Sequence, residues 1–479
     1  MNRRVLLIGG TGVFGERLAR HLCPLGGIDL IVSSRSELKA TQLAARLMQA
    51  HPYASVSAVQ LDHRHNLAAR LEALKPFIVI DCSGPFQNAG YAVAKTVLQA
   101  GVHFVDLADA RDYLKGYASA LDETARQHGS VGLAGASSTP ALSAAAVRAV
   151  SSGWRRTDAI DICITPGGRS EVGRAVIAAI LSYAGRAIPI WREGRLSQTK
   201  GWLAWRSVTM PGLGRRRVAP VETLDAELLG PRHAVTSHVR FAAGLESLPE
   251  QWGMQVMARL AGWGLLRRPA GLTPMLLAMR RLTRATTSDR GGMSVQVKGL
   301  DAHGKPALAC YSLVASEGHG PNVPVLPAAA AVKALLRGDI EPGARLAERE
   351  LPLTAIEAEM TSYSIETKTE RVSLQKSLFE QALGSETFLA MPAAVQALHA
   401  STGAPVWSGR SEVRAAGSLL PRLVAKLFGF PASGSDIPVT VTVDRDISAD
   451  GPGRETCAGR LRHRPRRKRG IGRRRHHER

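Results

Sequence analysis

The feature that most constrains how this chain folds is a glycine turn close to its N-terminus. Residues 5–8 are apolar and β-branched at both ends, and beyond the turn Leu18 and Leu22 recur four residues apart. Between the two segments lies the run Gly9-Gly10-Thr11-Gly12-Val13-Phe14-Gly15. A short apolar run, a glycine turn and a four-residue apolar repeat, in this order, predict a strand, a tight turn and a helix.

Five more short apolar segments follow this first strand, and helical stretches separate them. They cover residues 30–32, 56–61, 77–80, 102–105 and 131–134. Parallel strands can be joined only by crossovers such as helices. The first 150 residues therefore predict an α/β domain with a doubly wound parallel sheet of the Rossmann type.

The glycines of the turn follow the spacing Gly10-x-Gly12-x-x-Gly15, for which a dinucleotide gives a physical reason. Gly10 allows the tight turn, Gly12 lets the backbone approach a pyrophosphate, and Gly15 lets the helix pack close to the strand. The N–H groups and the dipole at the helix N-terminus both favour phosphate. We predict that Gly9, Gly10, Thr11, Gly12, Val13, Phe14 and Gly15 bind a dinucleotide. The alternative is a structural turn that holds no ligand.

The end of the second strand predicts NADP rather than NAD as the cofactor. A domain that selects NAD usually carries Asp or Glu there, whereas this chain has Ser33-Ser34-Arg35. The Arg35 guanidinium can face the 2′-phosphate and the serine hydroxyls can donate to it. The alternative is that Arg35 only solvates a loop, and the nearby Glu37 favours that alternative.

Length and composition exclude several other classes of protein. A chain of 479 residues with 45% apolar residues predicts about three packed domains. The five cysteines are scattered without a C-x-x-C pair, so neither a disulfide framework nor a zinc knuckle is expected and no metal is predicted. No uncharged apolar run reaches the roughly 18 residues of a membrane span. We therefore expect a cytoplasmic protein that is soluble or lies at a membrane surface.

Four segments taken together resemble the NADP-binding domain of the saccharopine dehydrogenase-like family. They are residues 9–15, 81–86, 101–107 and 135–143. The resemblance implies that Ser83, Gly84 and Pro85 line the nicotinamide side of the cofactor and that Asp62 lies near the adenine. It also implies that the loop of residues 136–143 borders the substrate.

Membership of this family implies an NADP-dependent oxidoreductase that reduces a C=N or C=C bond. The family includes reductases of the lysine pathway, relatives that reduce lipid enoyl groups and many proteins without an assigned reaction, so the resemblance does not identify the substrate. The competing hypothesis is a non-catalytic NADP-binding scaffold or redox sensor. Asp106, Asp109 and Tyr113 follow the fifth strand and are candidate proton donors, or else helix caps.

A Y-x-x-x-K motif in the first domain does not predict a catalytic pair. Tyr91 and Lys95 match the Y-x-x-x-K spacing of short-chain dehydrogenases, but they open the helix after the fourth strand, whereas that chemistry lies after the fifth. We expect Tyr91 to pack near the cofactor loop and Lys95 to be solvated.

Basic and aromatic residues interleave beyond the first domain. Residues 185–217 contain eight Lys or Arg residues against the single acidic Glu193, together with Trp191, Trp202 and Trp205. This mixture suits an amphiphilic partner, such as an acyl chain on an anionic carrier or a lipid at a membrane surface. The alternative is that the tryptophans fill the core and the arginines coat the surface.

The remaining chain predicts two more domains and a tail. Residues 151–350 predict an α+β substrate and dimerisation domain, with a hairpin over 293–315 and a helix at 328–336 that returns to the first domain. Residues 370–451, with a helix from Leu378, a strand at 439–443 and a packed or surface His399, resemble a small domain sometimes appended to this family, here cut short.

Residues 452–479 carry 12 basic and 2 acidic residues of a chain with a net charge of +22, so a disordered tail is predicted. Such a block could bind nucleic acid. Translation in a shifted reading frame is the preferred interpretation, so no nucleic-acid partner is expected.

Overall fold

The structure is a computed structural model that describes residues 2–171, 173–266, 269–374, 378–392, 395, 406–413, 434–445 and 457–461. The chain divides into two compact units, of which the first covers residues 1–375 and the second begins at residue 376.

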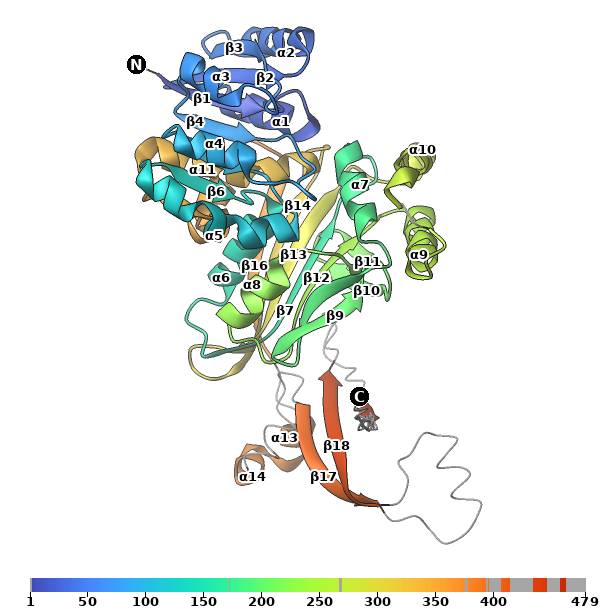
Figure 1. Cartoon of the computed structure of the whole chain (residues 1–479). Coiled ribbons are helices and arrows are strands. Elements are labelled where there is room, and N and C mark those ends of the chain that lie inside the picture. Colours follow the sequence, from blue (N-terminus) through green and yellow to red (C-terminus); the bar gives the residue numbers. More distant parts are fainter. Residues whose placement is uncertain are drawn as a thin grey trace, which may run out of the picture. The chain divides into compact units, whose positions relative to one another are not determined.

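A seven-stranded parallel sheet forms the N-terminal part of the first unit (Figure 1). Its order is β15-β6-β5-β4-β1-β2-β3. The strands are β1 (Arg3–Ile8), β2 (Ile28–Ser34), β3 (Ser55–Gln60), β4 (Ile78–Asp81), β5 (His103–Asp106), β6 (Val131–Ala134) and β15 (Gly343–Leu346). The predicted fold class, a doubly wound parallel sheet with a second α+β domain, is confirmed.

Helices cover both faces of this sheet because successive strand residues point to opposite sides. Val5 and Leu7 of β1 belong to one core, and Leu6 and Ile8 belong to the other. The first core holds α1 (Val13–Leu22), α2 (Glu37–Ala50) and α11 (Leu326–Arg337). The second core holds α3 (Leu67–Leu74), α4 (Ala92–Gln99) and α5 (Arg111–Gln127).

The predicted boundary of the second domain at residue 350 is wrong, because two strands near it divide between the sheets. β15 pairs with β6 in the N-terminal sheet, and β16 (Ile365–Ser373) pairs with β14 in the second sheet. α11 packs on α1 and β5, as expected for a helix that returns to the first domain. Gly343-Ala344-Arg345-Leu346 is too short and too weakly apolar to be recognised as a strand from its sequence.

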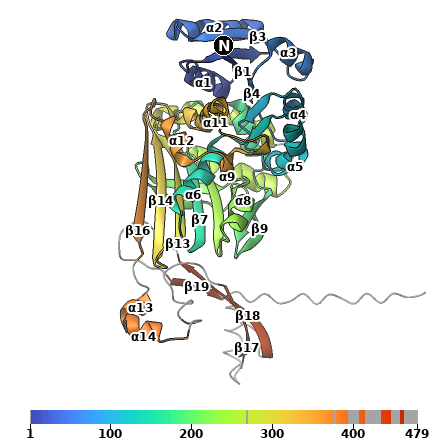
Figure 2. The same ribbon diagram turned by 90° about the vertical axis from the view of Figure 1, so that its left-hand side faces the viewer.

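A nine-stranded mixed sheet forms the rest of the first unit, and β13, β14 and β16 run side by side in it (Figure 2). The predicted hairpin corresponds to β13 (Gly291–Leu300) and β14 (Pro306–Ala315). The other strands are β7 (Arg156–Thr165), β8 (Ala187–Arg192), β9 (Arg195–Lys200), β10 (Arg206–Met210), β11 (Gly214–Pro220) and β12 (His238–Gly244).

One face of this second sheet is apolar and packs against helices. Ile160, Val295 and Tyr311 belong to the large core together with residues of α6 (Ser143–Val150) and α8 (Asp225–Arg232). The opposite face carries Asp161, which bonds to His238 Nε2 at 3.0 Å. The strand periodicity of two therefore separates the large core face from a face that mixes this polar pair with a smaller apolar cluster of Cys163, Val218 and Val314.

Three further helices lie together beside the second sheet (Figure 1). They are α7 (Arg174–Ser182), α9 (Leu248–Gly262) and α10 (Thr273–Thr283). A short helix, α12 (Leu353–Ala358), packs on α11 and α6. None of the helices that the structure describes combines the length and the hydropathy needed to cross a membrane.

The described part of the second unit contains two short helices and a three-stranded sheet. These are α13 (Leu378–Leu383), α14 (Ser385–Leu389), β17 (Val406–Val413), β18 (Gly434–Arg445) and β19 (Cys457–Leu461). The helix predicted from Leu378 and the strand predicted at 439–443 are both present, and His399 lies outside the described residues. The predicted start of this domain at residue 370 is wrong, because it falls inside β16.

The predicted disordered tail begins too early, because β19 lies within residues 452–479 and pairs with β18. The five residues of β19 include a single charged one, Arg460, so they can pair with a neighbouring strand although the tail as a whole is strongly basic. The rest of the tail lies outside the described residues.

Candidate active site

The glycine turn between β1 and α1 is held by backbone bonds and by very close packing. Gly10 N donates to Ser33 O at 3.0 Å and Gly12 N donates to Gly9 O at 2.9 Å. A Cβ on Gly15 would lie 2.2 Å from Gly9 O, so only glycine lets α1 approach the turn this closely. The structure thus gives Gly15 the spatial role that its position in the motif predicts.

The N-terminus of α1 is open on the side of the turn. Gly12 precedes the helix without a side-chain cap, and a Cβ built on it would meet only Gly9 O within 4 Å. Thr11 Oγ1 donates to Ser34 Oγ at 3.0 Å, which fixes the turn to the end of β2. The first-turn N–H groups of the helix therefore face a concave backbone surface that can receive phosphate. We call residues 9–15 the glycine cradle.

The residues predicted for the adenosine end lie side by side at the carboxyl ends of β2 and β3. Leu61 N donates to Ser34 O at 2.9 Å, and Gln60 Nε2 donates to Arg35 O at 3.0 Å. The Arg35 side chain is exposed. Asp62 Oδ1 accepts a bond from Arg64 N at 3.1 Å, and this bond lowers the pKa of Asp62.

Ser33 does not take the role expected of it. Its hydroxyl is buried and donates to Leu7 O at 2.7 Å, so it is engaged inside the sheet and cannot also donate to a ligand phosphate. Of the three residues, Ser34 is bonded to Thr11 of the cradle and Arg35 is exposed next to it.

The loop after β4 lies directly against the glycine cradle. Cys82 N donates to Ile8 O at 2.9 Å, and a Cβ on Gly9 would stand 2.9 Å from Ser83 Cα. Asp81 Oδ1 accepts a bond from Ser83 N at 2.8 Å, and burial raises the pKa of Asp81. The structure therefore brings Ser83, Gly84 and Pro85 to the same edge of the sheet as the cradle.

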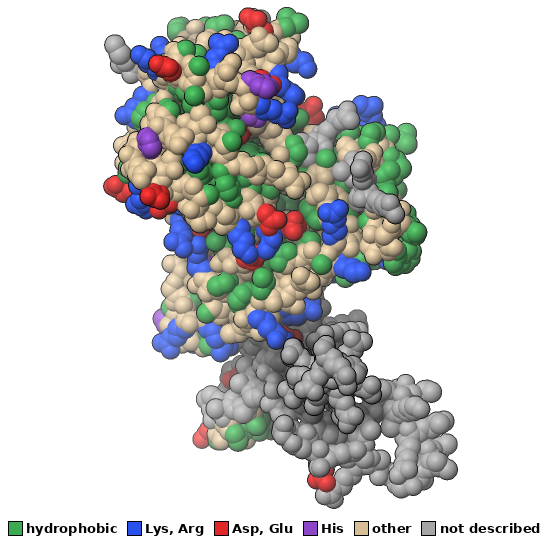
Figure 3. Space-filling model, viewed as in Figure 1, with side chains coloured by type: hydrophobic (Ala, Val, Ile, Leu, Met, Phe, Trp, Pro, Cys, Tyr) green, Lys and Arg blue, Asp and Glu red, His purple; other side chains and the backbone are tan. Residues whose placement is uncertain are grey.

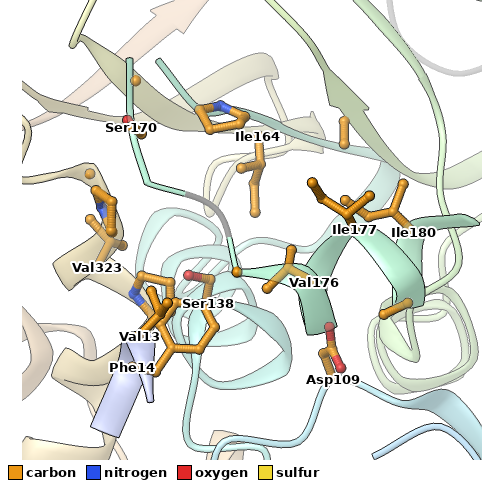
Figure 4. A pocket seen from close by; sticks show the side chains of 18 of the residues that line it. Val13, Phe14, Asp109, Ser138, Ile164, Ser170, Val176, Ile177, Ile180 and Val323 are labelled. Carbon is orange, nitrogen blue, oxygen red and sulfur yellow. The ribbon is translucent and has the colours of Figure 1, made fainter. Parts of the chain in front are cut away.

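A cavity of about 530 Å³ begins at this edge and extends over one end of the second sheet. Gly12, Gly84 and Pro85 form part of its wall on the cradle side. Most of its other walls are apolar side chains from α1, β7, α7, α9, α10 and the segment before α11: Val13, Phe14, Ile164, Val176, Ile177, Ile180, Met254, Leu276 and Val323. Among the labelled side chains of Figure 4, Asp109 is the one that carries a charge.

The structure separates the three candidate proton donors. Asp106 is completely buried, where its Oδ1 accepts bonds from Ala108 N at 3.0 Å and Gly135 N at 2.8 Å and its Oδ2 accepts one from Tyr113 at 2.9 Å. Burial raises the pKa of Asp106 to about 7. Asp106 and Tyr113 therefore join β5 to the loop after β6, and neither belongs to the cavity wall.

Asp109 is the member of the three that lines the cavity. Gln87 Nε2, on the loop after β4, donates to Asp109 Oδ1 at 3.4 Å. Asp109 is solvent-exposed, yet desolvation by the surrounding protein atoms raises its pKa. A carboxyl with a raised pKa beside an apolar cavity is a suitable general acid.

Tyr91 and Lys95 do not form a catalytic pair. The Tyr91 hydroxyl donates to Tyr113 O at 2.8 Å and its ring packs against the rings of Tyr113 and Tyr117, while Lys95 is exposed. These positions match the packing role expected for the tyrosine and the solvated role expected for the lysine.

A buried ion pair at the α9–α10 side of the cavity was not expected from the sequence. Arg280 Nη1 lies 3.4 Å from Glu250 Oε2, and Arg280 Nη2 also donates to Gly167 O and Ser170 O at 2.9 and 3.0 Å. Glu250 also accepts a bond from Thr283. Three segments that are far apart in the chain come into contact here, and a local sequence motif cannot predict such a contact.

The loop expected to border the substrate is fixed by α8. Ser137, Ser138 and Thr139 line the cavity, and Asp225 of α8 accepts bonds from Thr139 Oγ1 and Ser143 Oγ. Asp225 is completely buried, and desolvation raises its pKa. The second domain thus holds the loop that follows β6 of the first.

Some of the tryptophans are packed inside the protein and others are exposed. Trp202 is buried and lines the cavity, and Trp191 Nε1 donates to Val235 O at 2.7 Å. Trp205, Trp252 and Trp263 are exposed. None of the eight basic residues between 185 and 217 belongs to the cavity wall, so the basic pocket that a polycarboxylate would need does not come from that segment.

Comparison with known proteins identifies the first domain. Residues 5–133 match the model of the saccharopine dehydrogenase NADP binding domain, so this part of the chain is similar to that domain. Among curated proteins, no sequence matches the chain. Within the described residues, no group of three or more His, Cys, Asp or Glu side chains could hold a metal ion.

Several solved structures are similar at low sequence identity. The DAP dehydrogenase of C. glutamicum in complex with DAP is 14% identical, with 75% of this chain and 98% of that chain covered and a TM-score of 0.43. A meso-dapdh mutant with DAP from Clostridium tetani E88 is 14% identical, with 74% and 95% covered and a TM-score of 0.38. An engineered D-amino acid dehydrogenase bound to NADP+ is 13% identical, with 74% and 96% covered and a TM-score of 0.39.

Proposed function

We propose that this chain, whose residues 5–133 match the saccharopine dehydrogenase NADP binding domain, is an NADPH-dependent oxidoreductase that reduces a C=N or C=C bond of an apolar or amphiphilic substrate. The observation that carries the proposal is the cavity of about 530 Å³, which begins at the glycine cradle and is lined by Asp109, a carboxyl with a raised pKa. Its volume is typical of a site for a small molecule.

The residues at the carboxyl edge of the N-terminal sheet fit NADP in charge and in space. The cradle would hold the pyrophosphate at the N-terminus of α1. Gly12 has no Cβ there, so the backbone is open to the phosphates. Arg35 and Ser34 would bind the 2′-phosphate, and Asp62 would lie near the adenine. Ser83, Gly84 and Pro85 would line the nicotinamide, next to the cavity.

Arg35 supports a preference for NADPH over NADH. The side chain is exposed, and none of the described residues forms a hydrogen bond or an ion pair with its guanidinium, so the guanidinium is available to a ligand phosphate. No carboxylate stands at the end of β2, where one would repel that phosphate.

Reduction of a double bond requires a hydride and a proton. Bound NADPH would supply the hydride. Asp109 would donate the proton from its carboxyl, because its raised pKa keeps more of the acid form at a given pH than an ordinary aspartate has. The apolar walls would exclude water from the double bond and orient the substrate.

The walls of the cavity also indicate which substrates fit. Among the described residues that line it, Arg280 is the one basic side chain, and its charge is already paired with Glu250, while its Nη2 donates to Gly167 O and Ser170 O. A substrate with several carboxylates would find no free cation there. Each buried methylene contributes about 0.8 kcal/mol, so affinity should rise with the length of an apolar chain.

The proposal is tested by following NADPH absorbance with purified protein and a panel of α,β-unsaturated acyl thioesters and imines of increasing chain length. We expect turnover that improves with chain length. Asp109→Asn should lower kcat by about 10²- to 10⁴-fold and leave the Kd for NADPH unchanged. Glu171→Gln, at an exposed position of the same cavity wall, is the matched control and should retain kcat.

The pH profile provides a second measurement on the same variants. The acid form of Asp109 is the active one, so kcat should fall as the pH rises through its raised pKa, and Asp109→Asn should remove this limb. Tight NADPH binding without turnover on any member of the panel would instead favour the scaffold or redox sensor. An unchanged kcat in Asp109→Asn would exclude Asp109 as the donor.

A further inference from the structure

The outer surface of α9 and α10 is unusually apolar. Half of the fourteen large hydrophobic side chains that are exposed in the described chain lie within residues 248–282, among them Trp263 at 71% exposed and Leu282 at 83%. We call the seven of them the α9–α10 patch: Leu248, Trp252, Val256, Trp263, Leu265, Met275 and Leu282. Figure 3 shows hydrophobic side chains gathered over this lobe of the molecule.

Helical spacing aligns the α9 members of the patch along one side of that helix, and Trp263 and Leu265 follow directly after its end. Leu248, Trp252 and Val256 follow one another at intervals of four residues on α9, so they share one face. Met254 and Met257 of the same helix are buried on the opposite face. A helix on a water-exposed surface normally turns polar residues outward, so a helix that is apolar on both faces needs a second apolar partner.

The same two helices form part of the cavity wall. Met254 of α9 and Leu276 of α10 line the cavity from within, while Trp252 and Met275 point to the outside. Only the thickness of these helices therefore separates the proposed substrate cavity from the patch.

The segment that carries the patch has an excess of positive charge. Residues 248–288 contain six arginines and a single acidic residue, Glu250, which is buried and paired with Arg280. Arg259, Arg281 and Arg284 are exposed. Two copies of such a surface would repel each other, whereas anionic lipid phosphates would pair with the arginines. Tryptophan and arginine together are typical of segments that lie in a membrane interface.

We propose that the α9–α10 patch docks on the surface of an anionic phospholipid bilayer. The apolar side chains enter the headgroup and acyl boundary, and Arg259, Arg281 and Arg284 bind lipid phosphates. The docked molecule holds the wall of its cavity against the lipid, so an amphiphilic substrate can pass from the bilayer to the reduction site. This last step rests on the proposed function, whereas the docking itself does not.

The test uses the full chain with vesicles of phosphatidylcholine alone and of phosphatidylcholine mixed with phosphatidylglycerol. Co-sedimentation should be strong with the mixed vesicles, weak with the neutral ones, and reduced by salt. The triple variant Trp252→Gln, Trp263→Gln, Leu282→Gln should lose about tenfold or more in vesicle affinity, because three apolar side chains no longer enter the lipid. The matched control, Leu38→Gln with Met48→Gln, changes exposed apolar residues of α2 and should bind as the parent does.

Two further measurements separate the patch from other causes. Brominated acyl chains should quench tryptophan fluorescence of the parent and not of the triple variant. All the variants should bind NADPH with equal affinity in calorimetry, which would show that they are folded. A loss of vesicle binding can then be told apart from a failure of the proposed function. Triple-variant binding at the parent level would overturn the proposal and assign vesicle binding to the basic C-terminal residues instead. A change confined to the oligomeric state, measured by light scattering, would overturn it in favour of a second copy of the chain.

Discussion

Asp106 shows how one buried carboxyl at the end of β5 can make stability depend on pH. Burial raises its pKa in the folded chain to about 7, from an ordinary value near 3.8. The folded state therefore prefers the acid form, and the contribution of Asp106 to stability is complete below about pH 4 and is lost as the pH rises to about 7. A difference of about three pKa units corresponds to about 4 kcal/mol.

Asp106→Asn should remove this dependence, because an amide does not ionise. Between about pH 4 and pH 7 the free energy of unfolding in urea should fall in the parent. In Asp106→Asn this fall should be smaller by up to about 4 kcal/mol. Tyr113→Phe is the control, since it removes one hydrogen-bond donor and keeps the carboxyl, and should retain the dependence. Parallel stability curves for the parent and Asp106→Asn would contradict this account.

Arg35 tests cofactor choice at the scale of a single side chain. A charge-assisted hydrogen bond contributes about 1.5–3 kcal/mol, so Arg35→Ala should weaken NADPH binding by roughly 10- to 150-fold. NADH binding should barely change, since it has no 2′-phosphate. Calorimetric titration of the variant with both cofactors checks this, with Arg46→Ala on α2 as a control at another arginine. Equal losses for NADPH and NADH would mean that Arg35 does not recognise the phosphate.

At the scale of elements, α8 stabilises the loop that borders the cavity. Asp225→Ala would leave the Thr139 hydroxyl without its acceptor, at a cost of about 1–3 kcal/mol if it stays unpaired, whereas the Ser143 hydroxyl would keep Pro140 O as an acceptor. Because Thr139 lines the cavity, KM should rise while the Kd for NADPH stays nearly constant.

Urea unfolding and steady-state kinetics measure the two effects of Asp225→Ala. Glu227→Gln is the matched control on the same helix, where Lys115 and Arg111 are the partners and the loop is not involved. A loss of stability without any change in KM would limit Asp225 to a role in folding.

Most elements of the N-terminal sheet could be predicted from sequence, because each strand is a compact apolar run bounded by glycine or a polar residue. The hairpin of β13 and β14 was recognisable for the same reason, since its strands alternate around an Asp- and Gly-containing turn. β15 could not be found in this way. Its four residues form a strand because β6 offers an open edge and Asp122 of α5 accepts a bond from Ala344 N, and both are distant in sequence.

The candidate site divides in the same way. The glycine cradle and Arg35 follow from local motifs, Ser83–Pro85 follow from the family resemblance, and the structure gathers them at one edge of the sheet. The apolar cavity depends on Met254, Leu276 and other side chains from distant segments, which look like ordinary core residues in the sequence. The bond from Ser33 to Leu7 O could not be foreseen either. Adjacent strand residues point to opposite faces, and the sequence does not show which of the two serines at the end of β2 points into the sheet.

At the scale of the whole molecule, the first domain is built from two separate stretches of chain. A fragment of residues 1–150 lacks β15 and α11, so the edge of β6 and the apolar surface of α1 would be exposed. We expect this fragment to aggregate or to bind NADPH far more weakly than the full chain.

Residues 1–375 keep both elements and are the matched control, with an NADPH Kd equal to that of the full chain. Calorimetry and light scattering measure binding and aggregation. A monomeric 1–150 fragment with the Kd of the full chain would show that β15 and α11 are dispensable.

The position of β15 also has a consequence for synthesis on the ribosome. The six other strands of the N-terminal sheet are complete by Ala134, but β15 emerges roughly 200 residues later, or about 10–40 s at ordinary elongation rates. During that interval the nascent domain presents an unpaired strand edge, a surface that chaperones recognise. Codon usage or pausing between residues 135 and 343 would therefore change the yield of folded protein without altering a single amino acid.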